Sequence, residues 1–124
     1  MEITYKVGII GCGLIGNKRA KALEGQTLTY VSDINEELAK KLATEYNCKY
    51  TTNYVELINS DVDIIIISTS NNMLIPIAIS AVNAGKHILI EKPGARTPEE
   101  MKGLIDAIKD TKIKVKVGFN HRYH

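Results

Sequence analysis

The sequence predicts a doubly wound α/β domain, a parallel sheet of about six strands with intervening helices in the order 3-2-1-4-5-6. Three observations support this fold class. Apolar segments such as Ile64–Ile67 are uninterrupted by polar residues, which is typical of parallel strands covered on both faces. Amphipathic segments of helical periodicity alternate with them along the chain. Glycines directly follow the first predicted strand, where such a fold turns from strand into helix.

The first half of the chain is expected to contain three strands and three helices. The strands are predicted at Ile3–Ile10, Leu28–Val31 and Lys49–Thr51, and the helices around Ala20 and Leu23, at Asn35–Tyr46 and at Tyr54–Ile58. The second of these helices carries its apolar residues at the helical period, which predicts one side that faces the core. That side is expected to consist of Leu38, Leu42, Ala43 and Tyr46.

The second half adds three strands and two helices. The strands are predicted at Ile64–Ile67, His87–Ile90 and Lys112–Val117, and the helices at Met73–Ala84 and from Pro98 onward. Gly85 ends the first of these helices, and Thr97-Pro98-Glu99-Glu100 is a capping box that begins the second. The residues of the second helix expected to face inward are Met101, Leu104, Ile105 and Ile108. Lysine alternates with apolar residues in the last strand, which suits a sheet edge.

The composition predicts one globular domain over residues 1–124. Hydrophobic residues make up 44% and charged residues 24% of the chain, ordinary values for a globular protein. The net charge of +2 gives no argument for a nucleic-acid or membrane partner, and we expect a cytoplasmic protein. Cys12 and Cys48 form no CxxC pair, and His121 and His124 have no third ligand, so no metal site is expected.

The segment Gly11-Cys12-Gly13-Leu14-Ile15-Gly16 matches the pattern G-x-G-x-x-G between a predicted strand and a predicted helix. In that context it predicts a dinucleotide site. Gly11 would permit the tight turn, Gly13 would leave room for the pyrophosphate, and Gly16 would let the helix pack closely on the strand. The free N–H groups of the helix would bind the phosphates. The alternative is a glycine-rich turn without a ligand, and Cys12 is expected to be a small packing residue rather than a redox centre.

Asp33 follows the second predicted strand and lies 22 residues after Gly11. An acidic residue at about this distance accepts hydrogen bonds from the adenosine ribose of a dinucleotide. A carboxylate there repels a 2′-phosphate, and the neighbouring Ile34 cannot offset that repulsion, so the pair favours NAD over NADP. The alternative is that Asp33 only caps the next helix, a task for which Asn35 is equally suited.

Ligands of doubly wound sheets bind beyond the carboxyl ends of the strands. Besides the glycine segment and Asp33, polar residues follow three more of the predicted strands, at Ser68–Asn72, Glu91-Lys92-Pro93 and Asn120-His121-Arg122. The predicted topology therefore gathers these segments at one edge of the sheet.

Several of these segments together resemble the N-terminal domain of the Gfo/Idh/MocA oxidoreductase family. They are Thr69-Ser70-Asn71, Ala84-Gly85-Lys86-His87, Glu91-Lys92-Pro93 and Gly118-Phe119-Asn120-His121-Arg122-Tyr123. The resemblance runs from about Tyr5 to His124 and implies a Rossmann fold that binds NAD. It implies that Lys92 is the catalytic residue, near the nicotinamide and the reacting hydroxyl of the substrate. The full set of expected cofactor contacts is Gly11, Cys12, Gly13, Leu14, Ile15, Gly16, Asp33, Ile34, Ser68, Thr69, Ser70, Asn71, Glu91, Lys92 and Asn120.

The chain departs from the family pattern at two positions. The family often has proline in place of Ser70 and histidine in place of Leu74, and leucine cannot make that histidine's hydrogen bonds. Family members also continue into a second α/β domain, which binds substrate and forms oligomers. The resemblance therefore implies a small-molecule substrate held by a C-terminal domain absent from these 124 residues, and a homo-oligomeric full-length protein.

Two functions are compatible with these residues. The first is an NAD-dependent oxidoreductase that transfers hydride to or from a hydroxyl-bearing carbon of a sugar, cyclitol or sugar derivative. Lys92 would hold that hydroxyl and help to move its proton. The second is a non-catalytic NAD-binding sensor or regulatory module. Lys92 favours the enzyme, and we expect this chain to bind NAD yet to be inactive alone.

Overall fold

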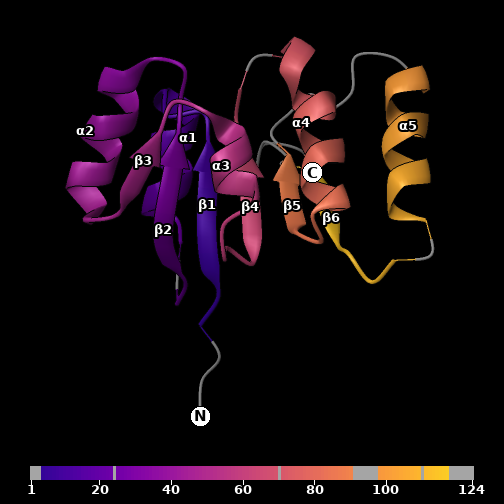
Figure 1. The fold of residues 1–124 in the computed structure, drawn as a ribbon, viewed down its shortest axis with the longest axis horizontal. Coiled ribbons are helices and arrows are strands. Elements are labelled where there is room, and N and C mark those ends of the chain that lie inside the picture. Colours follow the sequence, from indigo (N-terminus) through magenta and orange to yellow (C-terminus); the bar gives the residue numbers. More distant parts are fainter. Residues whose placement is uncertain (1–3, 24, 70, 91–97, 110, 118–124) are drawn as a thin grey trace, which may run out of the picture.

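The computed structural model describes residues 4–23, 25–69, 71–90, 98–109 and 111–117. Strands and helices alternate along these residues (Figure 1). The strands are β1 (Lys6–Ile10), β2 (Thr27–Ser32), β3 (Lys49–Thr51), β4 (Ile64–Ile67), β5 (His87–Ile90) and β6 (Val115–Val117). The helices are α1 (Leu14–Lys21), α2 (Glu36–Tyr46), α3 (Tyr54–Ile58), α4 (Asn71–Asn83) and α5 (Pro98–Ile108).

The strands form one parallel sheet in the order β3-β2-β1-β4-β5-β6, which confirms the predicted fold class and strand order. The chain runs from β1 outward to β3 and then returns to β4 on the other side of β1. Ile10, the last residue of β1, is in register with Ser32 of β2 and with Ile67 of β4. The loops that follow these three strands therefore share one edge of the sheet, at the switch point where ligands of such folds bind.

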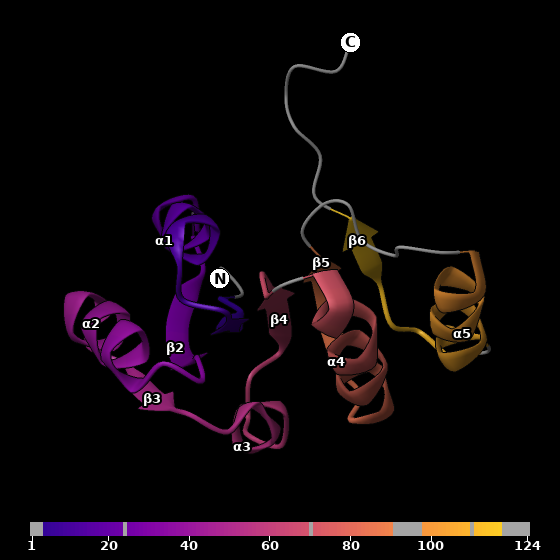
Figure 2. The ribbon, with the colours of Figure 1, turned by 90° about the horizontal axis from the view of Figure 1, so that it is seen from above.

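The helices lie on both faces of the sheet. Helices α1 and α2 lie on one face, and α3, α4 and α5 lie on the other (Figure 2). The core is divided in the same way: Ile65 and Ile67 of β4 pack with residues of α3, α4 and α5, whereas Ile66 packs on the opposite side with residues of α1 and α2. This arrangement explains the uninterrupted apolar sequence of β4, because both of its faces are covered.

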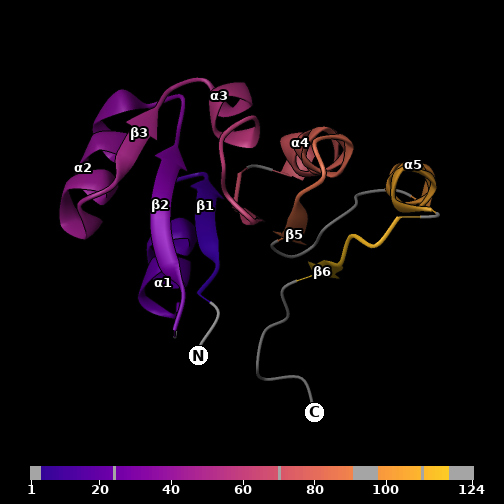
Figure 3. The same ribbon diagram turned by 60° about the horizontal axis from the view of Figure 1, so that its bottom comes forward.

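Part of the sheet is covered on one face only. On the face that carries α1 and α2, no helix of the described residues lies over β5 and β6 (Figure 2 and Figure 3). Leu89 of β5 is consequently only half-buried, whereas its neighbours Ile88 and Ile90 are buried on the side of α4. Among the described segments, no helix has both the length and the apolarity that a membrane span requires.

Local chemistry accounts for several helix ends. The side-chain oxygen of Asn35 accepts hydrogen bonds from two backbone N–H groups in the first turn of α2, and Asn53 caps α3 in the same way through one such bond. Gly85, predicted to follow α4, has a φ of +83°, a left-handed conformation that glycine adopts without strain.

Two side chains predicted to face the core are exposed instead. Leu38 is 38% exposed, and its neighbour Ala39 is fully buried. A helix turns about 100° per residue, so a buried stripe centred on Ala39 leaves Leu38 at its margin. Ile105 is 53% exposed and Leu104 only 1%, because α5 lies at the end of the molecule beside α4 and buries a narrower stripe (Figure 1). Strands β1 and β6 also begin later than predicted, at Lys6 and Val115.

Candidate functional site

The loops at the carboxyl edge enclose a pocket of about 370 Å³. Six of the predicted cofactor-binding residues line it: Gly11, Gly13, Asp33, Ile34, Ser68 and Thr69. These residues come from three loops, and Gly11 and Ser68 are 57 positions apart in the sequence. The sheet topology therefore makes neighbours of residues that are far apart in the sequence.

The three glycines of the first loop have different surroundings. Gly11 has a φ of +103°, and a Cβ atom on it would lie 2.6 Å from the backbone oxygen of Ser68. A Cβ atom on Gly16 would lie 2.0 Å from the backbone oxygen of Gly11, so helix α1 could not approach the loop this closely with any other residue there. A Cβ atom on Gly13 would meet nothing within 4 Å. Gly11 and Gly16 are thus required by packing, whereas Gly13 leaves open space beside the pocket.

Asp33 joins the glycine loop to the start of α2. One carboxylate oxygen accepts a hydrogen bond from the Cys12 backbone N–H at 2.8 Å, and the other accepts one from the Asn35 N–H, also at 2.8 Å. The cap of α2 is Asn35, not Asp33. An ionised carboxylate has about four lone-pair positions, so Asp33 keeps acceptor capacity for further hydroxyl groups.

Ser68 supports the same loop from the end of β4. Its hydroxyl donates to the Gly11 backbone oxygen at 2.8 Å, and its backbone N–H donates to the Ile10 oxygen, also at 2.8 Å. The next residue is different. The Thr69 hydroxyl oxygen is buried, and it has no hydrogen-bond partner within the described part of the chain. Because a buried hydroxyl without a partner is unfavourable, this pocket-lining atom is suited to a ligand.

Other predicted residues of the glycine segment do not line the pocket. Cys12 is 1% exposed and its thiol donates to the Ser32 backbone oxygen at 3.3 Å. Burial, with a smaller contribution from the Asp33 charge, raises the pKa of the Cys12 thiol to about 12, as befits a packing residue. The side chains of Leu14 and Ile15 are exposed, by 73% and 42%. Neither residue lines the pocket.

Some pocket residues were not predicted. Thr52 and Tyr54 follow β3, and Met73 and Ile77 come from α4. The signal for the first pair was present in the sequence, because β3 is a parallel strand whose carboxyl end lies at the same edge as the others. No sequence pattern marked the two α4 residues, which become pocket residues through the packing of that helix on the sheet.

The remaining predictions fall partly or wholly outside the described residues. Ser70, Glu91, Lys92 and Asn120 are not among them. Asn71 is the first residue of α4, which places its backbone at the carboxyl edge. Leu74, where the resembling family often has histidine, is fully buried in the core beneath this edge.

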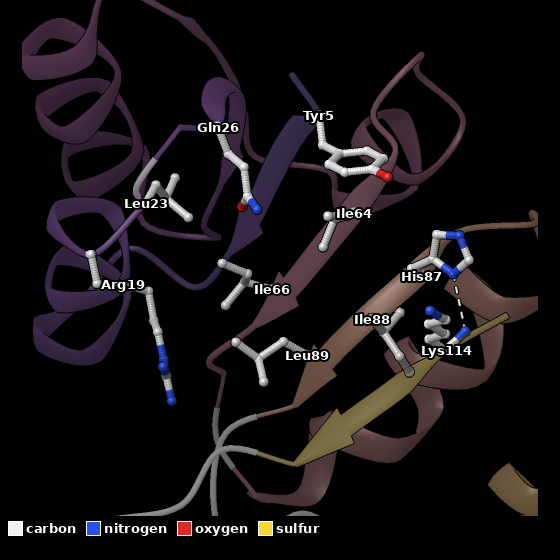
Figure 4. Close-up of a pocket in the computed structure, with 11 residues that line it drawn as sticks. Tyr5, Arg19, Leu23, Gln26, Ile64, Ile66, His87, Ile88, Leu89 and Lys114 are labelled. Carbon is white, nitrogen blue, oxygen red and sulfur yellow. Dashed lines mark hydrogen bonds between the residues drawn. The ribbon is translucent and has the colours of Figure 1, made fainter. Parts of the chain in front are cut away.

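A larger pocket of about 470 Å³ lies on the half-covered face of the sheet (Figure 4). Its floor is formed by Ile64, Ile66 and Leu89, and Arg19 and Lys114 lie at its sides. It contains none of the predicted site residues. We place the candidate site in the smaller pocket, because the strand-end loops, the Asp33 carboxylate and the Thr69 hydroxyl meet there.

The start of α1, beside the smaller pocket, is open to an anion. No side chain caps the N-terminus of α1, and its first turn contains no acidic residue, so its N–H groups and its partial positive charge are available to an anion. Open space at Gly13 lies beside this turn. The described residues contain no group of three or more His, Cys, Asp or Glu side chains that could hold a metal ion.

Comparison with known proteins shows extensive similarity. The sequence model GFO_IDH_MocA, described as an oxidoreductase family with an NAD-binding Rossmann fold, matches residues 5–119. Levoglucosan dehydrogenase of Pseudarthrobacter phenanthrenivorans is 36% identical over 94% of this chain and 33% of its own length. Inositol 2-dehydrogenase of Salmonella typhimurium is 35% identical over 98% of this chain and 38% of its own length. The chain thus spans about a third of the length of these curated relatives.

Solved structures have the same fold. Levoglucosan dehydrogenase in complex with NADH superposes with a TM-score of 0.84 at 33% identity, over 97% of this chain and 36% of that protein. An NAD-binding oxidoreductase from Klebsiella pneumoniae superposes with a TM-score of 0.87 at 26% identity, over 96% of this chain and 35% of that one.

Proposed function

Because this chain belongs to the Gfo/Idh/MocA oxidoreductase family, whose NAD-binding Rossmann domain it forms, we propose that it carries the cofactor of an NAD-dependent dehydrogenase. The observation that carries the proposal is the pocket at the carboxyl edge. There the Asp33 carboxylate, the open space at Gly13 and the Thr69 hydroxyl, which has no partner among the described residues, surround one cavity. In a turn that binds nothing, the open space at Gly13 and the Thr69 hydroxyl, which has no partner among the described residues, would have no evident purpose.

The first turn of α1 would hold the pyrophosphate. Its backbone N–H groups have no intrahelical acceptor, and the helix dipole adds a partial positive charge. Gly13 allows the phosphates to approach, because no atom of the described residues lies within 4 Å of the position that a Cβ would take. Leu14 and Ile15 would contribute their N–H groups, and their exposed side chains need take no part.

Asp33 would bind the adenosine ribose through the lone pairs that its two backbone partners leave free. Ile34 is 90% exposed at the rim of the pocket and carries no charge. A 2′-phosphate would meet the negative carboxylate without a compensating cation from Ile34, so the site favours NAD over NADP.

The nicotinamide ring, when bound, supplies the hydride chemistry. The end of β4 would orient it, with contacts from Ser68 and Thr69 and from the neighbouring Ser70 and Asn71. Lys92 follows β5 in the sequence and would hold the substrate hydroxyl and exchange its proton, beside Glu91 and Asn120. These roles rest on the family motif that the residues match.

We propose a sugar, cyclitol or related polyol as the substrate of the full-length protein, by analogy with the levoglucosan and inositol dehydrogenases. Polypeptide beyond these 124 residues would complete the substrate site and form a homo-oligomer. Cys12 and Cys48 are both free thiols, which suits the reducing cytoplasm.

The experiment is to titrate the 124-residue chain with NADH and NADPH by calorimetry at one salt concentration, and then to supply NAD with a panel of sugars and polyols. We expect NADH to bind at least about tenfold more tightly, a difference of about 1.4 kcal/mol. We expect no turnover. Positioning the substrate against the cofactor can lower the barrier by about 7–11 kcal/mol, and we propose that residues outside this domain hold the substrate in place.

Tighter binding of NADPH would contradict the cofactor assignment. Robust turnover by this chain, abolished in Lys92→Ala, would show that it is catalytically complete. In a longer protein that contains this domain, Lys92→Ala should abolish turnover and leave NADH binding intact. Binding without turnover in that longer protein would instead favour the regulatory module.

A further inference from the structure

We propose that Asn17 is a positioning residue for the dinucleotide pyrophosphate, which orients the glycine loop without contacting the cofactor. Its side-chain Nδ2 group donates to the backbone oxygens of Cys12 and Gly13, at 3.0 and 2.8 Å. Asn17 is half-buried and does not line the pocket. The inference rests on the proposed function of the domain and adds to it a residue outside the glycine motif.

The two carbonyl groups held by Asn17 determine where two N–H groups point. A trans peptide unit is planar, with its C=O and N–H directed to opposite sides. The Cys12 carbonyl shares a unit with the Gly13 N–H, and the Gly13 carbonyl shares one with the Leu14 N–H. Because Asn17 holds both carbonyls toward itself, both N–H groups are directed away from it, as a pair of neighbouring donors of the kind that binds anions.

The preceding N–H groups of the loop are already engaged. The Gly11 N–H donates to the Ser32 backbone oxygen at 2.8 Å, and the Cys12 N–H donates to Asp33 at 2.8 Å. The Gly13 and Leu14 N–H groups stand at the start of α1, where no intrahelical acceptor exists. The Gly13 and Leu14 N–H groups, which Asn17 orients, are therefore among the donors that remain for a phosphate, together with the Ile15 and Gly16 N–H groups of the same helical turn.

The bond to Cys12 is not part of ordinary helix formation. The Gly13 oxygen already accepts the Asn17 backbone N–H at 3.0 Å, as the first turn of a helix requires. The Cys12 oxygen lies before the helix and receives the Asn17 side chain instead. Without it, the Cys12–Gly13 unit could rotate and turn a carbonyl dipole toward the phosphates, which would repel them.

The test uses Asn17→Ala and Asn17→Asp in the 124-residue chain. Aspartate has nearly the same shape as asparagine but, when ionised, only accepts hydrogen bonds, so it cannot hold either carbonyl. Both variants should bind NADH and ADP-ribose about ten to a hundredfold more weakly, and should bind adenosine, which has no phosphate, with nearly unchanged affinity. Asn17→Gln, which keeps the donor, should recover part of the loss. Asn83→Ala, exposed at the end of α4, is the control.

A second readout reports on the donors themselves. Saturating ADP-ribose should move the amide proton resonances of Gly13 and Leu14 in the original chain, and this movement should shrink in both variants. Thermal unfolding shows whether Asn17→Ala and Asn17→Asp are folded. If one of them is not, the binding data of the other variant test the positioning role.

The experiment distinguishes a failure of the proposed function from a failure of the positioning role of Asn17. If the unaltered chain binds neither NADH nor ADP-ribose, the proposed function is wrong. If it binds both, and a folded Asn17→Ala chain binds them equally well with the same amide shifts, the positioning role is wrong and the proposed function stands. An equal loss for adenosine would also overturn the positioning role, because a general loosening of the site would explain it.

Discussion

The Asp33 carboxylate accepts a hydrogen bond from the Cys12 backbone N–H at 2.8 Å. This bond joins the loops that follow two adjacent strands, β1 and β2, and Asp33 also lines the pocket. Asp33 thus holds the glycine loop, and the ribose contact proposed for it would be a second task. The two tasks use different lone pairs of one side chain, so substitutions can separate them.

We expect Asp33→Asn to weaken NADH binding and to reduce the preference for NADH over NADPH. The amide keeps one oxygen as an acceptor but loses the charge, and hydrogen bonds to a charged group contribute about 1.5–3 kcal/mol each. Calorimetric titration with both nucleotides measures the change. The control is Asp63→Asn, because Asp63 accepts the Lys6 backbone N–H at 2.8 Å at the opposite edge of the sheet. An unchanged NADH to NADPH ratio in Asp33→Asn would exclude this role.

Gly13→Val should abolish cofactor binding and leave the fold intact, because a Cβ atom there meets no protein atom within 4 Å. Gly16→Ala should instead unfold or strongly destabilise the chain, because its Cβ would lie 2.0 Å from the Gly11 oxygen. Circular dichroism during heating and NADH fluorescence distinguish the two effects. If Gly13→Val bound NADH normally, the glycine segment would be a structural turn only.

Thr69→Val should stabilise the chain without cofactor and weaken its binding of NADH. Valine has nearly the shape of threonine and removes a buried hydroxyl that has no partner among the described residues. Burying such a hydroxyl costs about 1–3 kcal/mol on protein scales. Bound cofactor would lose the hydrogen bond that this hydroxyl offers. Denaturant unfolding with and without NADH measures both changes. Thr29→Val, in β2 away from the pocket, is the matched control, and a loss of stability in Thr69→Val would refute the prediction.

The two cysteines should react slowly with thiol reagents at pH 8. Burial raises the pKa of Cys12 to about 12 and that of Cys48 to about 11, against about 8.5 in an unfolded chain. Between these values the folded chain holds more protons than the unfolded one, so the free energy of unfolding should fall as the pH rises above about 8.5. Cys12→Ala should reduce this slope in denaturant titrations at pH 8 and 10. Rapid labelling of the two thiols in the folded chain at pH 8 would contradict the raised pKa values.

Local sequence predicted some elements at their observed bounds. Strands β3, β4 and β5 and helix α3 coincide with their predictions. For β4 and β5 the signal was a short apolar run, which acts over a few residues. The exposed Leu38 and Ile105 were wrongly predicted to be buried. Adjacent apolar residues at a helix margin are equivalent in a periodic pattern, and only the neighbouring sheet decides which of them is covered.

The sequence by itself determined the parallel sheet, its strand order, the glycine loop and the candidate role of Asp33, because each depends on residue type and spacing along the chain. The tertiary structure alone decided that Asp33 holds Cys12 and that Ser68 supports Gly11 from 57 residues away. It alone also decided that the Thr69 hydroxyl has no partner among the described residues and that Met73 and Ile77 line the pocket. The physical reason is one of range. Hydrogen bonds and burial act over a few ångströms, and strand register and helix packing determine which distant residues come that close.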